Sequence, residues 1–167
     1  MTKHQLKVEE ILRKLISFNT VSSESNLELI SFIETSFSQL GIQSTRVVSD
    51  DGKKSNIFAS IGPTDTAGVI LSGHTDVVPT SKNWSTDPFV ATIKDEKVFG
   101  RGTCDMKGFI ACTLAYAPIF SKTNLDRDIH FSFTFDEETA CQGAPLLINE
   151  LKRKGMNSGI CIVGEPT

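Results

Sequence analysis

Four short segments carry the side chains that could do chemistry: HTDVVP at residues 74–79, GRGTCDMKG at 100–108, DEE at 136–138 and GEPT at 164–167. Each supplies a histidine or a carboxylate, and three of them follow an apolar stretch as long as a β-strand. One histidine with several carboxylates is a ligand set suited to zinc or a similar divalent ion. The segments therefore predict a metal site, provided that the fold brings them together.

The first segment places His74 at the end of an apolar strand, with Asp76 two residues later. Positions two apart in an extended chain face the same way, so the Asp76 carboxylate can lie beside the His74 ring. A metal-binding imidazole usually gives its second N–H to a carboxylate or carbonyl, and Asp76 suits that role. The same residues would also fit a capped turn in which His74 has no function.

The second segment sets Asp105 among three glycines, just before a predicted helix. An aspartate at that point can simply cap the helix, whereas the glycines indicate unusual backbone geometry or a close approach. A phosphate-binding loop is a weaker alternative, because the spacing matches neither a P-loop nor a dinucleotide fingerprint. The neighbouring Cys104 is a conceivable further ligand.

The third and fourth segments supply carboxylates. Three consecutive acids at residues 136–138 repel one another unless water or a cation relieves them. They could form a solvated turn; alternatively one glutamate binds metal and its neighbour serves as general base. Glu165 follows the last apolar strand and indicates little by itself. Together the four segments favour two metal ions, since a carboxylate shared by two ions is usual in two-metal hydrolases.

Helices and strands alternate along the chain and must position these segments. Apolar spacing predicts helices near residues 6–16, 26–40, 107–120 and 143–154, strands near 42–48, 57–61, 69–72, 129–135 and 159–163, and a hairpin over 89–99. This order predicts an α/β fold, a three-layer sandwich with a mostly parallel mixed central sheet, incomplete at the C-terminus. The carboxyl ends of such strands are where α/β sheets place ligands.

Composition excludes several classes of function. The 167 residues are 39% hydrophobic with a net charge of −3, enough for one domain with a core. The sequence has no cluster of basic residues on one face of the kind that binds nucleic acid. The basic run at residues 152–154 is suited to the end of a helix. The sequence contains neither a long apolar run nor a signal segment, so a cytoplasmic protein is expected and not a membrane protein. The cysteines show no metal or disulfide spacing and are predicted to be reduced and mostly buried: Cys104, Cys112, Cys141 and Cys161.

The four segments and their order along the chain resemble the co-catalytic zinc amidohydrolases and metallopeptidases. This family includes acetylornithine deacetylase, succinyl-diaminopimelate desuccinylase, aminoacylase and glutamate carboxypeptidase. The likeness extends over essentially the whole chain. Within the family it is strongest to the acetylornithine deacetylases, through LISFNTVS, SNIFASIGP, LSGHTDVVP, a W-x-x-DPF segment and GRGTCDMKGFIA.

The resemblance implies a role for each site residue. His74 and Glu165 would bind one zinc ion and Glu138 a second, with Asp105 bridging both; cobalt could replace zinc. Glu137 would be the general base that takes a proton from the attacking water and passes it to the departing amine. Asp76 would orient His74. In the family a cis peptide follows the bridging aspartate.

The implied activity is the release of acetate and L-ornithine from N2-acetyl-L-ornithine in arginine biosynthesis, with an N-acyl amino acid as the small-molecule partner. Alternatives are a desuccinylase, an aminoacylase or a carboxypeptidase, or an inactive truncated metal-binding fragment. The family's late histidine ligand and its lid or dimerisation domain have no counterpart, and His130 is expected to be an ordinary strand histidine. Residues 1–167 are therefore expected to be the N-terminal part of a catalytic domain that forms a homodimer at full length.

Overall fold

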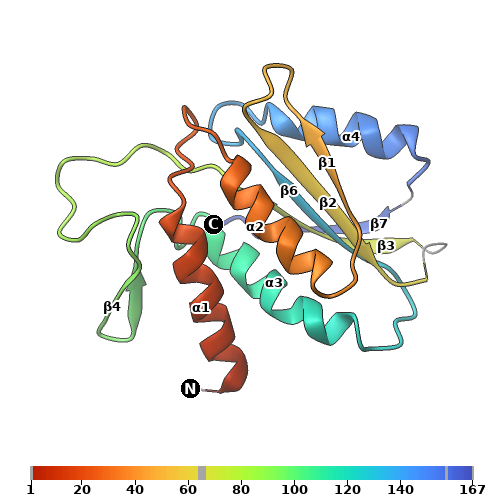
Figure 1. Ribbon diagram of the computed structural model, residues 1–167, viewed down its shortest axis with the longest axis horizontal. Helices are drawn as coiled ribbons and strands as arrows, with labels where there is room; N and C mark the ends of the chain where they lie inside the picture. The colour runs from red at the N-terminus through yellow and green to blue at the C-terminus, as the bar shows by residue number, and fades with distance from the viewer. Residues whose placement is uncertain (1, 64–66, 157, 167) are drawn as a thin grey trace.

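The computed structural model describes residues 2–63, 67–156 and 158–166 (Figure 1). Thr167, at the end of the fourth segment, lies outside the described residues. The elements are α1 (Lys3–Ser17), α2 (Leu27–Ser38), β1 (Ser44–Val48), β2 (Ser55–Ile61), β3 (Gly68–His74), β4 (Thr92–Lys94), β5 (Lys97–Phe99), α3 (Lys107–Phe120), β6 (Ile129–Thr134), α4 (Gly143–Arg153) and β7 (Ser158–Val163). The predicted order of helices and strands is confirmed.

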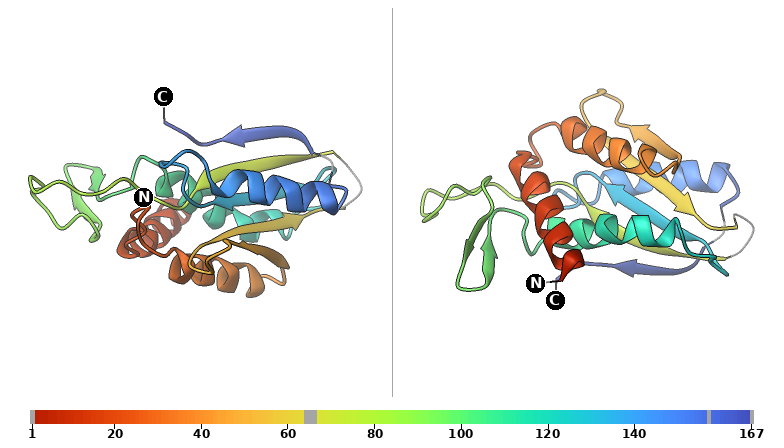
Figure 2. Two further views of the ribbon diagram at one scale, coloured as in Figure 1. Left: turned by 90° about the horizontal axis from the view of Figure 1, so that it is seen from above. Right: turned by 60° about the horizontal axis from the view of Figure 1, so that its bottom comes forward.

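Five strands form the central sheet in the order β1-β2-β6-β3-β7. The β1–β2 and β2–β6 pairs are antiparallel, and β3 runs parallel to both β6 and β7. Within this sheet only β2 therefore runs against the others, which confirms the predicted mixed sheet. Helices α2 and α3 pack on one face, with α1 against α3, and α4 covers the other face over β1, β2 and β6 (Figures 1 and 2). The three layers are thus as predicted.

The main core lies between the sheet and the helices α2 and α3. Alternation along β6 directs Phe131 and Phe133, both fully buried, into this core. The Phe131 ring lies 5.1 Å from that of Phe37 on α2. The intervening His130 faces the layer of α4, where its Nδ1 lies 2.8 Å from the Ser60 hydroxyl, so the expected strand histidine is confirmed.

The register of the sheet brings the chemical segments to one end. His74, the last residue of β3, pairs with Thr134 of β6, so residues 136–138 follow just beyond it. On the other side of β3, Ser72 pairs with Val163, and the Gly164 N–H donates to the Ser72 carbonyl at 3.2 Å. Because β2 is antiparallel to β6, its first residues reach the same end.

The predicted burial of the cysteines is wrong: all four are free thiols but exposed. Cys104 and Cys141 lie in loops, and Cys112 lies on the side of α3 away from its buried residues. Cys161 lies on β7, which is paired only with β3 among the described strands. A cysteine is buried only when it lies on the face of a helix or strand that packs against the core. The spacing of residues in the sequence did not show which face each cysteine would occupy. None of the described helices has both the length and the apolar character needed to cross a membrane.

Replacing Phe131 by alanine should cost about 3–5 kcal/mol of unfolding free energy, since its ring is fully buried against Phe37 and Phe133. Urea unfolding of the chain measures this. The control is Ile93→Ala, whose side chain is 43% exposed on the β4–β5 hairpin; it should change stability by no more than about 0.5 kcal/mol. Equal losses from both variants would contradict the assigned core.

Candidate metal centre

His74 forms the floor of the site and is 1% exposed at the end of β3. Its Nδ1 lies 2.9 Å from the Asp76 carbonyl oxygen and its Nε2 lies 2.9 Å from Oδ1 of Asp105. With Nδ1 donating to the carbonyl, Nε2 faces the acids and can bind a cation. Burial alone would lower the pKa of His74, but the hydrogen bonds and charge of Asp76, together with Asp105, raise it to about 9.

The predicted acids converge on the His74 ring. Nε2 lies 3.6 Å from a carboxylate oxygen of Glu165 and 3.8 Å from one of Glu137. Ligand atoms of His74, Asp105 and Glu165 lie within 4.8 Å of one another, and so do those of His74, Glu137 and Glu138. The structure therefore brings together the four residues predicted to bind metal, around one histidine. The second group also contains Glu137, predicted as the general base, and does not contain Asp105, predicted as the bridge.

Crowding of these carboxylates indicates what the site would accept. Burial, and then the charge of Asp105, raise the pKa of Glu138. The same two causes raise the pKa of Glu165. Several carboxylates beside one imidazole, partly withdrawn from water, repel one another, and a divalent cation would relieve this repulsion. The donor set and its geometry thus fit zinc or a similar ion.

Asp76 has a larger role than the sequence indicated. Its carbonyl oxygen is the nearer partner of the His74 ring, because its carboxylate lies 3.4 Å from Nδ1. The carboxylate instead accepts the backbone N–H groups of Glu137 at 3.0 Å and Glu138 at 3.2 Å, and the Ser22 hydroxyl at 2.7 Å. Burial would raise the pKa of Asp76, but hydrogen bonds from His74, Ser22 and Glu137 lower it. One residue therefore connects the histidine, through its carbonyl oxygen, to the acidic pair, through its carboxylate.

Asp105 does not cap the following helix. Helix α3 begins at Lys107, and its N-cap residue, Met106, makes no side-chain capping bond. The peptide between Asp105 and Met106 is cis, as the resemblance implied. Gly102, with φ +83°, passes so close to Val77 that a Cβ would come within 2.7 Å of its side chain. Gly102 thus leaves room for the Val77 side chain, and the Asp105 carboxylate faces His74.

Supporting residues, among them Lys107 and Asn26, were missed by the sequence analysis. Lys107 is fully buried, and its ammonium donates to the carbonyls of Leu15 at 3.0 Å and Phe18 at 2.8 Å, at the end of α1. Burial lowers its pKa to about 7. Asn26 donates to the Thr75 hydroxyl at 2.9 Å and exchanges two hydrogen bonds with the Ser55 backbone. Both bond across the fold, so no local spacing marked them. Cys104, considered as a ligand, joins neither metal group among the described residues.

Comparison with known proteins agrees with this geometry. Residues 70–167 match the family described as peptidase family M20/M25/M40. The chain belongs to this family. Residues 70–167 include every predicted metal ligand, from His74 to Glu165.

M20 relatives with curated names include acetylornithine deacetylases. The enzyme of Yersinia pseudotuberculosis (strain IP 31758) is 34% identical over 170 residues, covering 95% of this chain and 43% of that enzyme. The enzyme of Shigella sonnei is 36% identical over 166 residues, covering 95% of this chain and 42% of that enzyme. The chain thus spans less than half the length of these relatives.

Solved structures share the fold. Human carnosine dipeptidase 1 matches with a TM-score of 0.78 at 21% identity, over 98% of this chain and 39% of that chain. A metallo-carboxypeptidase from Sulfolobus solfataricus matches with a TM-score of 0.79 at 19% identity, over 98% and 37% of the two chains. The predicted family and α/β fold are therefore confirmed.

Replacing Asp76 by asparagine should destabilise the metal-free chain by about 1–3 kcal/mol at pH 7, because three hydrogen bonds to a buried carboxylate are altered. The folded-state pKa of Asp76 lies below the ordinary 3.8, so ionised Asp76 stabilises the fold above that pH. This contribution is lost as the pH falls below 3.8. Urea unfolding at neutral and acid pH should therefore show the two proteins converging on acidification; a gap that stays constant or widens would contradict it.

Proposed function

We propose that the chain is the N-terminal part of a zinc-dependent catalytic domain that hydrolyses the amide of an N-acyl amino acid, with N2-acetyl-L-ornithine as substrate. The observation that carries the proposal is the convergence of His74, Asp105 and the glutamates at the ends of β3, β6 and β7. The named relatives at 34–36% identity support the substrate. The first 167 residues of a longer homodimeric enzyme would match the share of those relatives that aligns.

His74, Asp105 and Glu165 would hold one zinc ion, and Asp105 with Glu138 would hold the second. Bound zinc supplies Lewis acidity, which acidifies water and polarises a carbonyl. The nearness of Asp105 and of Glu138 to the same His74 ring supports neighbouring positions for the ions.

Glu137 would move the proton. Its side chain is 39% exposed at the mouth of the site, while its backbone N–H is fixed on Asp76. As general base it would accept a proton from the water that attacks the amide carbon. The C–N bond then breaks, and the same proton passes to the departing amine. The oxygen of the water thus ends in acetate and the transferred proton in ornithine. Asp76 acts through its neighbours, by fixing the His74 ring and the Glu137 backbone.

Glu137→Gln should lower turnover by about 10²–10⁴-fold, since general acid–base catalysis contributes that much. Its zinc content should stay near that of the wild type. Glu138→Ala and Asp105→Ala should lower the zinc content, because each removes a ligand. Metal analysis after dialysis measures zinc content, and an assay of acetate release from N2-acetyl-L-ornithine measures turnover, both in the chain alone and in the protein encoded by the reading frame extended past Thr167. The loss of turnover is expected in the longer protein, because the chain alone is expected to be incomplete for catalysis.

Three results would contradict the proposal in different ways. Loss of zinc from Glu137→Gln would mean that Glu137 is a ligand and not the base. Faster hydrolysis of N-succinyl-diaminopimelate, of other N-acyl amino acids or of dipeptides would replace the substrate but keep the metal site. Binding of zinc without turnover by either form would favour the inactive metal-binding fragment.

A further inference from the structure

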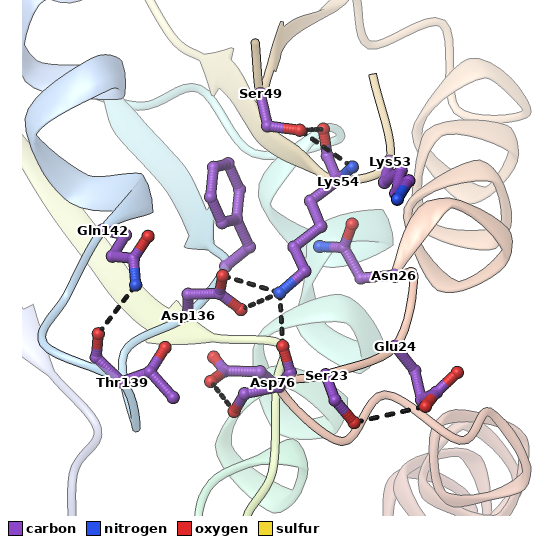
Figure 3. Close-up of polar contacts among 12 residues, drawn as sticks. Ser23, Glu24, Asn26, Ser49, Lys53, Lys54, Asp76, Asp136, Thr139 and Gln142 are labelled. Atoms are coloured by element: carbon purple, nitrogen blue, oxygen red, sulfur yellow. Dashed lines mark hydrogen bonds and ion pairs between the residues drawn. The ribbon is translucent and has the colours of Figure 1, made fainter. Parts of the chain in front are cut away.

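A buried ion pair lies directly behind the acidic pair of the site. The Lys54 ammonium lies 2.5 and 2.6 Å from the two carboxylate oxygens of Asp136, and the side chains are 15% and 10% exposed. Figure 3 shows the Lys54 side chain extending from the start of β2 to Asp136. The β2–β6 register pairs Ile57 with Phe133, and continuing it sets Lys54 opposite Asp136. Sheet pairing therefore places the two charges face to face.

Asp136 is the residue at which the chain turns from β6 into the site. It has φ +54°, a left-handed conformation that aspartate tolerates better than most residues other than glycine. Its carbonyl accepts the Gln142 N–H at 3.1 Å, which closes the loop that carries Glu137 and Glu138. The direction in which the two glutamates leave the sheet thus depends on how Asp136 is held.

The same ammonium also contacts the other side of the site. Lys54 Nζ donates to the Ser22 carbonyl, and the Ser22 hydroxyl donates to the Asp76 carboxylate at 2.7 Å. Asp76 in turn accepts the N–H groups of Glu137 and Glu138. Lys54 therefore contacts both groups that hold the acidic pair. It pairs directly with Asp136 at the turn, and it is linked through Ser22 to the Asp76 carboxylate, which accepts the N–H groups of the two glutamates.

We propose that the Lys54–Asp136 ion pair is a positioning device that sets Glu137 and Glu138 against His74, and thereby the affinity of the Glu138 side of the site for metal. This inference rests on the proposed metal site. A partner-less Asp136 or Lys54 would be a buried, uncompensated charge. The turn relieves that charge by moving toward water, and Glu137 and Glu138 move with it.

A role in folding stability alone makes a different prediction from a positioning role. If the pair only stabilises the fold, its loss lowers the free energy of unfolding and leaves the zinc affinity of the folded protein unchanged. If it positions Glu138, its loss weakens zinc binding only while Glu138 is present. The two cases are separated by combining the substitutions.

The experiment is a zinc titration of the folded chain against a chelating dye, with urea unfolding of each variant alongside. Lys54→Met and Asp136→Asn should each lower zinc affinity about 10- to 100-fold, the usual effect of removing an outer partner of a metal ligand. Lys54→Arg should restore most of it. In a Glu138→Ala background, Lys54→Met should change affinity by no more than about twofold, because the residue that it positions is gone.

The matched control is Arg46→Met, which breaks the Arg46–Glu34 pair at 2.6 Å between β1 and α2 and should leave zinc affinity unchanged. Asp136→Asn, which keeps the size of the side chain, carries the test if Lys54→Met does not fold. Unchanged zinc affinity in the folded Lys54 and Asp136 variants would overturn the inference, and so would an equal loss with and without Glu138. A wild-type chain that binds no zinc would instead overturn the proposed function.

Discussion

The arrangement of the site depends on one buried carboxylate. Asp76 is 2% exposed and accepts the N–H groups of Glu137 and Glu138 and the Ser22 hydroxyl, while its own carbonyl holds the His74 ring. A charge so far from water is stable only when such donors surround it. The donors to the carboxylate come from two separate parts of the chain, and the Asp76 carbonyl bonds to the His74 ring, so this one residue fixes the histidine relative to the acidic pair.

The sheet makes that convergence possible. Parallel pairing of β3 with β6 and β7 brings the carboxyl ends of these three strands to the same end of the sheet. Strand β2 runs in the opposite direction, so its first residues lie at that end too. Lys54 at the start of β2 contacts Asp136, and Asn56, two residues on, accepts the Phe135 N–H at 3.1 Å and donates to the Gly143 carbonyl at 2.8 Å. Strand β2, which carries no predicted ligand, therefore supports the turn that carries two glutamates.

Features with a local signal were predictable from the sequence. Helix α3 begins and ends where apolar spacing placed it, and the strand-end histidine and acids meet as their order indicated. What local pattern could not predict were contacts made across the fold, such as those of Lys54, Asn26 and Lys107. The exposure of Cys161 was missed for the same reason, because a single sequence does not say which strand lies at the edge.

The central claim, that separate strand ends form one metal site organised around His74 and Asp76, is tested most directly by diffraction. Crystals of the chain grown with zinc and measured at the zinc absorption edge should show an anomalous peak beside Nε2 of His74, within bonding distance (about 2.0–2.2 Å) of that nitrogen and of carboxylate oxygens of Asp105 and Glu165. A peak at another part of the surface, or zinc that contacts these acids but not His74, would contradict the account.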